Sequence, residues 1–358
     1  MTISGRRMVF VRAGRPLECR RWDVGPPAAG GAVVRVTHAG VCGSDVHRLD
    51  GEQTDMGYPV AFGHEGVGVV EALGEGVRVD TDGVPLRAGD AVYWANRGPV
   101  SESLGVTWPP PADVPSQAAY QDYATLTADN AIYRIPEGTD PEAVIAFGCA
   151  MPTALGGMAR LGPIRPGQSV VVQGCGPVGL AATMLAGLSM ARQVIVIGAP
   201  ETRLARAETL GATATIALET TSAAERAEAV RELTGGRGAD VVVEATGNPA
   251  AFEEGFGLLA ESGRYLILGL YAGSGTVALD PFRLNNRSLS VIGSLGPTHH
   301  CDYRTTIQLA GRHGERLSIA GLITHRFPLG RTEEAIDTMR RGEAVKAVVL
   351  PTMEEAAT

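Results

Sequence analysis

Residues 169–190 read SVVVQGCGPVGLAATMLAGLSM, and this stretch decides the fold of the chain. The apolar, β-branched run Ser169–Gln173 predicts a buried strand. A glycine-rich turn, GCGPVG at 174–179, follows it, and the apolar run Pro177–Met190 predicts a helix. A G-x-G-x-x-G turn that leaves a strand and opens a helix is typical of a dinucleotide-binding site.

Each residue type in this turn has its own physical reason. Gly174 permits the tight turn, Gly176 lets the backbone approach a pyrophosphate, and Gly179 lets helix and strand pack closely. Pro177 and Val178 open the helix, whose first N–H groups and positive dipole end would face the phosphates. We assign these five residues to cofactor binding. The alternative is a glycine-rich turn that binds no ligand.

The same alternation of strands and helices continues on both sides of this turn. Further strands are expected at Gln193–Ile197, Asp240–Glu244 and Tyr265–Leu268, and helices at Thr153–Leu161, Glu201–Leu210, Ala223–Leu233 and Ala250–Leu259. Strands that alternate with helices indicate a parallel sheet covered on both faces. We place this doubly wound α/β domain at residues 151–296.

The rest of the chain has a different texture, and 358 residues suggest two domains. Short β-branched runs predict strands at Ala32–His38, Gly66–Leu73 and Asp90–Trp94, within an irregular, mostly β domain at 1–150. Residues 297–358 return to it, with helices near Tyr303–His313 and Thr332–Arg340 and a last strand at Ala347–Leu350. The proline-rich segment Pro99–Gln117 predicts an exposed loop.

The end of the second strand of the α/β domain bears on cofactor choice. Gly198 stands where such folds usually carry the acid that binds the adenosine ribose. Its absence would relieve repulsion against a 2′-phosphate, so NADP remains possible, with Arg203 as the nearest cation. However, Glu201 is close and no arginine follows immediately, so we favour NAD over NADP.

Three residues of the chain offer ligands that suit zinc, namely Cys42, His64 and Cys149. A catalytic zinc needs about three protein ligands and one open position. Each residue alone is ambiguous, because isolated cysteines are often buried and a single histidine is more often structural. Their spacing along the chain does not establish a site.

The motifs that surround these residues occur in a distinctive order. They are GVCGSDVH at 40–47, GHEGVGVV at 63–70, GDAV at 89–92, FGCA at 147–150 and the glycine turn at 174–179. Over essentially its whole length the chain resembles the zinc-dependent medium-chain dehydrogenase/reductase family, which includes alcohol, sorbitol and threonine dehydrogenases. The resemblance implies a GroES-like, mostly β catalytic domain, a Rossmann domain, and zinc- and NAD(P)-dependent alcohol dehydrogenase activity.

The resemblance also implies a role for each motif residue. Cys42, His64 and Cys149 would be the catalytic zinc ligands, Glu65 an acid that can approach the metal, and Asp45 a carboxylate that orients the ligand histidine.

Four further residues receive roles in the same way. Ser44 and His47 would form a proton relay, Thr153 would pack near the nicotinamide, and Lys346 would contact the pyrophosphate. The alternatives are a turn hydroxyl for Ser44 and an exposed polar residue for His47.

The chain departs from the family in one respect, because many relatives hold a second, structural zinc with four cysteines. The matching stretch, Asn96–Tyr123, contains no cysteine, so we predict one zinc per chain. We expect Trp94 and Asn96 to border the substrate pocket. With His299 they favour a secondary alcohol, cyclic or polyol-like. The triplet His299–Cys301 is interpreted as pocket lining, with a surface turn as the alternative.

Composition bears on partners and compartment. The net charge of −8 does not favour nucleic acid or an anionic membrane as a partner, and no apolar run reaches the roughly 18 residues needed to span a bilayer. Five scattered cysteines fit a reducing cytoplasm. The resemblance implies a small alcohol or carbonyl substrate and a homo-oligomer, dimer or tetramer. Two alternatives remain, a zinc-free enone or quinone reductase on the same fold and a non-catalytic nucleotide-binding protein.

Overall fold

The computed structural model of the chain describes residues 3–52, 58–95, 111–273 and 275–354. The chain divides into two compact units, the first made of Met1–Cys149 with His299–Thr358 and the second of Ala150–Thr298. The chain therefore leaves the first unit after Cys149 and returns to it at His299.

The second unit is built on a six-stranded sheet in which all neighbouring strands run parallel, in the order β11-β10-β9-β12-β13-β14. Its strands are β9 (Ser169–Gln173), β10 (Gln193–Gly198), β11 (Ala214–Ala217), β12 (Ala239–Glu244), β13 (Leu259–Ile267) and β14 (Ser290–Gly293). Strand β9 is buried at every position, as expected for a central strand with both faces covered. Strands β11 and β14 were not expected from the sequence, and both lie at the edges.

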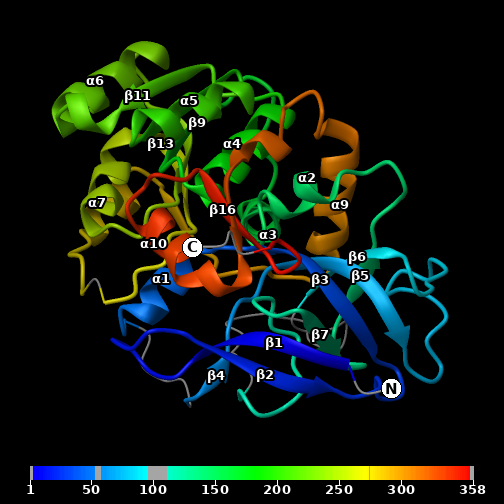
Figure 1. Cartoon of the computed structure of the whole chain (residues 1–358). Helices are drawn as coiled ribbons and strands as arrows, with labels where there is room; N and C mark the ends of the chain where they lie inside the picture. Colours follow the sequence, from blue (N-terminus) through cyan, green and yellow to red (C-terminus); the bar gives the residue numbers. More distant parts are fainter. Residues whose placement is uncertain (1–2, 53–57, 96–110, 274, 355–358) are drawn as a thin grey trace. The chain divides into compact units, whose positions relative to one another are not determined.

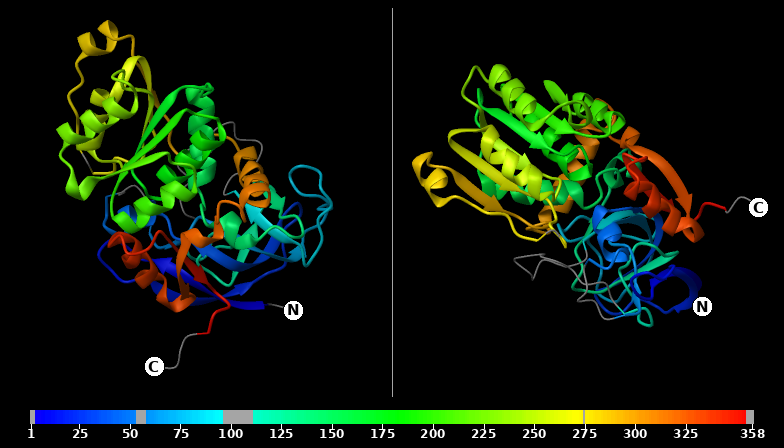
Figure 2. Two further views of the ribbon diagram at one scale, coloured as in Figure 1. Left: turned by 90° about the horizontal axis from the view of Figure 1, so that it is seen from above. Right: turned by 90° about the vertical axis from the view of Figure 1, so that its left-hand side faces the viewer.

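Helices cover both faces of this sheet (Figure 2). One group, linked by contacts of α4 with α3 and α5, is α3 (Ala150–Leu161), α4 (Pro177–Leu188) and α5 (Glu201–Thr209); the other is α6 (Ala223–Leu233) and α7 (Pro249–Leu258). The short helices η1 (Leu218–Thr220) and α8 (Pro281–Asn286) complete the unit. The strand order is that of the Rossmann fold, which confirms the predicted class and puts the end of β9 where the strand order reverses.

The first unit contains two sheets. The smaller has the order β2-β1-β4, with β1 (Ile3–Phe10), β2 (Glu18–Val24) and β4 (Val60–Ala61). The larger has the order β15-β16-β3-β5-β6-β8, with β7 also paired to β3; its strands are β3 (Ala32–Gly40), β5 (Gly66–Leu73), β6 (Ala91–Trp94), β7 (Tyr123–Leu126), β8 (Ile132–Arg134), β15 (Ile323–Pro328) and β16 (Lys346–Leu350). Strand β16, red in Figure 1, pairs antiparallel with the blue β3, so the two ends of the chain build one sheet.

The helices of the first unit lie between its strands along the chain, and most are short. They are α1 (Gly43–Leu49), α2 (Pro141–Ile145), α9 (Cys301–His313), α10 (Thr332–Arg340), η2 (Ala320–Leu322) and η3 (Leu329–Arg331). The core of the unit is apolar and includes Phe10, Phe62, Trp94 and Tyr120.

The predicted exposed loop Pro99–Gln117 is borne out in part, because Pro111, Asp113, Val114 and Pro115 are exposed. Its first part, through residue 110, lies outside the described residues, and so does Asn96. In the remainder, Ala112 and Ser116 are buried at 8% and 1% exposure. The backbone N–H of Ala112 donates to the carbonyl of Pro59, so this part of the segment packs against the chain beside β4.

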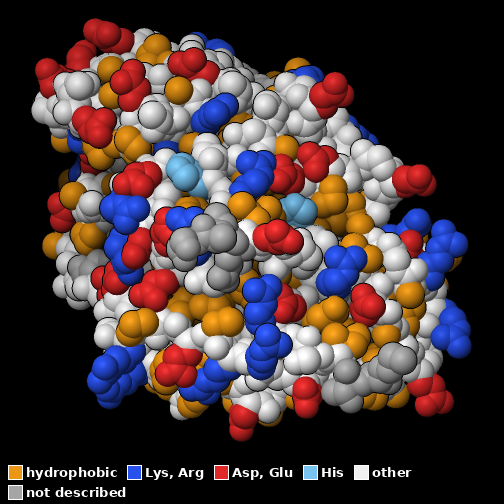
Figure 3. All heavy atoms as spheres, in the orientation of Figure 1, with side chains coloured by type: hydrophobic (Ala, Val, Ile, Leu, Met, Phe, Trp, Pro, Cys, Tyr) orange, Lys and Arg blue, Asp and Glu red, His pale blue; other side chains and the backbone are white. Residues whose placement is uncertain are grey.

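Helix length and surface charge are the two structural features that bear on membrane and nucleic-acid partners. In the part of the chain that the structure describes, no helix is long and apolar enough to cross a bilayer. On the face drawn in Figure 3, acidic and basic side chains are interspersed, and neither sign forms a continuous field. A basic stripe is the usual footprint of a nucleic-acid-binding surface.

Candidate metal centre and dinucleotide turn

Three segments of the first unit bring the predicted ligands together. Cys42 follows β3 as the N-cap of α1, and His64 follows β4. Cys149 follows α2 and is the last residue before the chain enters the second unit. The ligand atoms of Cys42, His64, Glu65 and Cys149 all lie within 4.8 Å of one another. The structure therefore brings together residues that are more than a hundred positions apart in sequence.

The spacing of the two sulfurs fits a shared zinc ion. Cys42 Sγ and Cys149 Sγ are 3.6 Å apart. Two sulfurs at about 2.3 Å from one tetrahedral ion lie about 3.8 Å apart, whereas a disulfide needs about 2.05 Å. Two cysteines and one histidine are also a donor set found in catalytic zinc sites, so the residues present fit the metal.

The imidazole of His64 is held by a buried carboxylate. Its Nδ1 lies 3.3 Å from Oδ1 of Asp45, which is fully buried. The other carboxylate oxygen accepts hydrogen bonds from the Tyr120 hydroxyl at 2.8 Å and from the backbone N–H of Cys42 at 3.1 Å. Arg48 supplies a cation, with Nη1 3.7 Å from Asp45 Oδ1. Asp45 thus fixes the orientation of one ligand and the backbone of another.

A second buried ion pair lies on the other side of the cluster. Glu65 Oε2 is 2.5 Å from Lys346 Nζ, and both side chains are 1% exposed. Glu65 Oε1 accepts a hydrogen bond from the backbone N–H of Cys149 at 2.9 Å. A Cβ atom on Gly40 or Gly148 would lie 2.0 Å from Glu65 Oε2, so these two positions need glycine to make room for the carboxylate.

Lys346 has partners in the structure that the resemblance did not imply. Its ammonium group is buried and donates to the carbonyl of Val41 at 2.9 Å as well as to Glu65. The side chain is therefore directed at the metal-ligand cluster, and two of its three N–H donors are used inside the first unit. Here it neutralises Glu65, and the pyrophosphate contact stays a prediction.

Without a metal, the three ligands hold protons among themselves. The hydrogen bond between the two sulfurs lowers the pKa of Cys42 and raises that of Cys149, although burial disfavours both thiolates. Burial also disfavours a charged His64, but Asp45 and Cys42 outweigh it and raise the pKa of His64 to about 10. A metal must displace protons from Cys149 and His64 when it binds.

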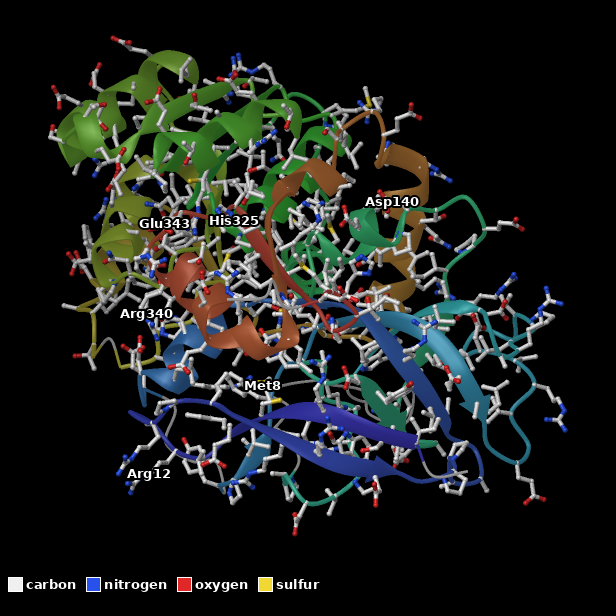
Figure 4. The ribbon with its side chains drawn as sticks, in the orientation of Figure 1. Met8, Arg12, Asp140, His325, Arg340 and Glu343 are labelled. Atoms are coloured by element: carbon white, nitrogen blue, oxygen red, sulfur yellow. The ribbon has the colours of Figure 1, made fainter. Side chains whose placement is uncertain are left out.

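Two contacts fix the short helices that carry the site. Arg340 on α10, labelled in Figure 4, places Nη2 2.8 Å from Oδ1 of Asp50 at the end of α1. Asp140, also labelled, caps α2 by accepting the backbone N–H of Glu142 at 2.9 Å. Helices of so few residues depend on such tertiary contacts and caps, because they are not stable alone.

The predicted proton relay lies on the first turns of α1. Ser44 is half-buried, and the side chain of His47 is 34% exposed. His47 Nδ1 lies 2.5 Å from Oε2 of Glu52, so the imidazole has an acidic partner that the sequence did not suggest. A carboxylate on one ring nitrogen orients the ring and fixes its tautomer.

The glycine turn of the second unit has the geometry expected of it. Gly174 has a φ of 106°, and Gly176 is the N-cap of α4 with Pro177 in its first turn. A Cβ on Gly179 would lie 1.9 Å from the carbonyl oxygen of Gly174, so only glycine allows this approach of helix and turn. Val178 follows Pro177 in the same turn of α4, whose free N–H groups can bind an anion.

The residues beside this turn explain why position 198 carries glycine and not the acid that usually binds the adenosine ribose. A Cβ on Gly198 would lie 2.5 Å from Sγ of Cys175, so sulfur fills the space at the end of β10. Burial raises the pKa of the Cys175 thiol, and its S–H donates to the carbonyl of Ala199 at 3.2 Å. Arg203 lies in the first turn of α5 and is partly buried, which lowers its pKa. Thr153 lies on α3 and is 6% exposed.

Trp94 is not where the sequence placed it. Its side chain is 1% exposed, its ring fills the space left by Gly66, and its Nε1 donates to the carbonyl of Gln117 at 3.0 Å. It therefore belongs to the core and not to the pocket edge. Its predicted neighbour Asn96 lies outside the described residues.

The triplet His299–Cys301 leads into α9, where the ring of His300 stacks beside Tyr133 and its Nδ1 is hydrogen-bonded to the Tyr133 hydroxyl.

Several residues around the cluster were missed by sequence reasoning. They are Arg48, Glu52, Tyr93 and Tyr120. Arg48 and Glu52 lie within a few residues of motif positions, so a search for local charge partners could have found them. Tyr93 comes from β6 and Tyr120 from the segment before β7, and neither carries a signal in sequence.

Comparison with known proteins agrees with this arrangement. Residues 28–137 match the alcohol dehydrogenase GroES-like domain family, and residues 177–312 match the zinc-binding dehydrogenase family. The chain is 42% identical to a 5-exo-hydroxycamphor dehydrogenase from Pseudomonas putida, over 97% of this chain and 100% of that one. It is 31% identical to an L-threonine 3-dehydrogenase from Bacillus subtilis, over 89% and 90%. The crystal structure of an alcohol dehydrogenase from Thermotoga maritima matches with a TM-score of 0.86 and 28% identity, covering 97% and 99%.

Proposed function

Because the chain belongs to the zinc-dependent medium-chain dehydrogenase/reductase family and is an alcohol-oxidising oxidoreductase, we propose that it oxidises a cyclic secondary alcohol to the ketone with NAD, reversibly. The observation that carries the proposal is the convergence of Cys42, His64 and Cys149 within 4.8 Å in the first unit. The relative with 42% identity, named for a hydroxylated camphor, supports the choice of a rigid cyclic substrate.

The protein's own side chains would prepare the alcohol for reaction. Cys42, His64 and Cys149 hold the zinc ion, which when bound supplies a Lewis acid that lowers the pKa of the substrate hydroxyl. Asp45 keeps the His64 ring in one orientation, and Arg48 compensates the carboxylate's charge. The two thiolates neutralise the dipositive ion, and the nearby carboxylates each have a cation, so the site adds no net charge to its surroundings.

The proton and the hydride leave the alcohol by different routes. Ser44 accepts the hydroxyl proton, and His47 passes it to solvent while Glu52 holds the opposite ring nitrogen. Gly174, Gly176, Pro177, Val178 and Gly179 would hold the pyrophosphate of the cofactor, and Thr153 would pack beside its nicotinamide ring. When bound, the nicotinamide would supply the hydride acceptor that the oxidation of the alcohol to a carbonyl needs. We keep these assignments as proposals.

The cofactor and metal content follow from features near the two sites. We infer a preference for NAD because Glu201 opens α5 directly after β10 and no arginine precedes it there. We infer one zinc per chain because the stretch Asn96–Tyr123, in which many relatives hold a structural zinc with four cysteines, contains no cysteine. None of the five cysteines, all of which lie in the described residues, forms a disulfide, which supports a reducing compartment such as the cytoplasm.

A screen of alcohols with both cofactors tests the function. Reduced nicotinamide is followed by absorbance, with and without a chelator, on cyclic secondary alcohols and on short primary alcohols. We expect turnover of the cyclic alcohols, a higher kcat/KM with NAD than with NADP, and loss of activity with the chelator. Oxidation of short primary alcohols alone would contradict the substrate class, and full activity without metal would contradict the zinc site.

We also infer that the chain forms a homo-oligomer through the open edge of the second unit's sheet. Strand β14 ends the sheet, and the segment around it exposes Leu279, Phe282, Val291 and Leu295, with Phe282 at 73% exposure. An edge strand flanked by apolar side chains is a template for pairing with another chain. Light scattering tests this: we expect Phe282→Asp to reduce the mass, and a monomeric wild-type chain would refute it.

A further inference from the structure

The peptide group between Gly148 and Cys149 is held at both of its polar atoms. The carbonyl oxygen of Gly148 accepts a hydrogen bond from the Tyr93 hydroxyl at 2.8 Å, and the N–H of Cys149 donates to Glu65 at 2.9 Å. These two atoms belong to one planar unit, so the two bonds fix the direction of the plane. That plane in turn directs the Cα–Cβ bond of Cys149 towards Cys42.

Gly148 makes such restraint necessary. It has a φ of 50°, in the left-handed region, and the Glu65 carboxylate excludes any side chain from the position. Glycine populates many backbone conformations, so the segment before Cys149 has no intrinsic preference for the one observed. A contact from outside the segment must select it.

Tyr93 is itself rigidly placed. It lies in β6, which pairs with β5 and β8, and its side chain is fully buried. Its ring packs against Tyr303 of α9, with ring centroids 4.9 Å apart at an angle of 44°. The hydroxyl therefore reaches Gly148 from a sheet whose position does not depend on the ligand loop.

We propose that Tyr93 is a positioning residue of the metal centre, whose hydroxyl holds the Gly148–Cys149 peptide so that Cys149 Sγ meets Cys42 Sγ. It acts through the backbone and does not touch the substrate. This inference rests on the proposed zinc site. It adds to the metal ligands a residue that helps retain the ion, and this residue precedes the ligand Cys149 by 56 positions in the sequence.

The test compares Tyr93→Phe with wild-type protein in two measurements on the full chain. One is the rate at which zinc passes to an excess of chelator, and the other is the thiolate-to-metal absorption of protein loaded with Co²⁺. Phenylalanine keeps the ring against Tyr303 and removes only the donor. We expect zinc release to accelerate about tenfold, as for other contacts that orient metal ligands, and the cobalt band to shift.

Tyr265→Phe in the second unit is the matched control. Tyr265 is also fully buried and donates its hydroxyl to a backbone carbonyl, that of Phe252, at 3.0 Å. We expect a similar loss of thermal stability in both variants but a change of cobalt spectrum and zinc release only in Tyr93→Phe. If Tyr93→Phe loses stability while retaining the wild-type spectrum and release rate, Tyr93 has a structural role alone and the inference is overturned.

Two further outcomes are also decisive. If Tyr93→Phe does not fold, Tyr303→Leu leaves the hydroxyl but removes the ring on which Tyr93 packs; a faster zinc release supports the inference, and an unchanged rate overturns it. If wild-type protein shows no thiolate-to-cobalt absorption, the zinc site itself is refuted, and the inference with it. The two failures are thus distinguished by the wild-type spectrum.

Discussion

Replacement of Lys346 by methionine should strongly destabilise the first unit. Lys346 Nζ is the cation 2.5 Å from the Glu65 carboxylate, and both side chains are 1% exposed. Methionine has a similar length and fills the space without charge. The substitution therefore leaves a buried carboxylate without its counter-ion and the carbonyl of Val41 without its donor.

The distance and burial set the size of the effect. At an effective dielectric constant of about 20, two unit charges 2.5 Å apart attract by about 6–7 kcal/mol. Part of this offsets the desolvation of both groups, and breaking a buried pair from one side typically costs about 3–5 kcal/mol. We expect that loss for Lys346→Met. The double variant with Glu65→Gln removes both charges and keeps an oxygen for the Cys149 N–H, so it should lose less than about 2 kcal/mol.

Tryptophan fluorescence isolates the relevant transition. Trp22 and Trp94 lie in the first unit, and the sequence of the second unit contains no tryptophan, so urea unfolding followed by tryptophan emission reports on the first unit. The measurement is made on metal-free protein at neutral pH, because zinc stabilises by mass action. A loss below about 1 kcal/mol in Lys346→Met, or a double variant as unstable as the single one, would refute the reasoning.

Three other outcomes follow from the same structure. Zinc should raise the unfolding midpoint of the tryptophan signal in wild-type protein, and Cys149→Ala should lose most of this increase, because the cluster then has one thiolate fewer. Arg326 donates hydrogen bonds to Glu142 and lowers the pKa of that carboxyl group. The stabilisation that this ion pair gives the folded state is therefore present above the unfolded-state pKa of about 4.3 and lost as pH falls through the lower folded-state pKa. Glu142→Gln should cost less than about 1 kcal/mol at pH 7 and nothing near pH 2, measured by urea unfolding. Gly198→Asp should bind neither cofactor well, because its Cβ would collide with Cys175 Sγ. The double variant Gly198→Asp with Cys175→Gly removes that collision and should raise the ratio of kcat/KM with NAD to kcat/KM with NADP. Equal ratios for the double variant and wild type would contradict the view that Cys175 occupies the place of the ribose-binding acid.

The parts of the fold that the sequence predicted are those with local causes. The turn at Gly174–Gly179 depends on residues within a few positions of one another, and the strand before it and the helix after it show their periodicity directly. The edge strands β11 and β14 were missed, since each is four residues long and partly exposed and so lacks a long apolar run. Trp94 was misplaced because a β6 residue can face either side, and only the space left by Gly66 decides which.

The candidate site shows the same division between local and distant causes. Sequence motifs supplied the two buried acids, Asp45 and Glu65, but neither cation was assigned to its acid. Arg48 lies one turn of helix from Asp45, while Lys346 is 281 residues from Glu65 and reaches it only because β16 pairs with β3. A carboxylate buried beside metal ligands requires a compensating charge, since an isolated buried charge costs several kcal/mol. The sequence therefore predicts that such a cation exists, whereas its identity follows only from the pairing of strands at the two ends of the chain.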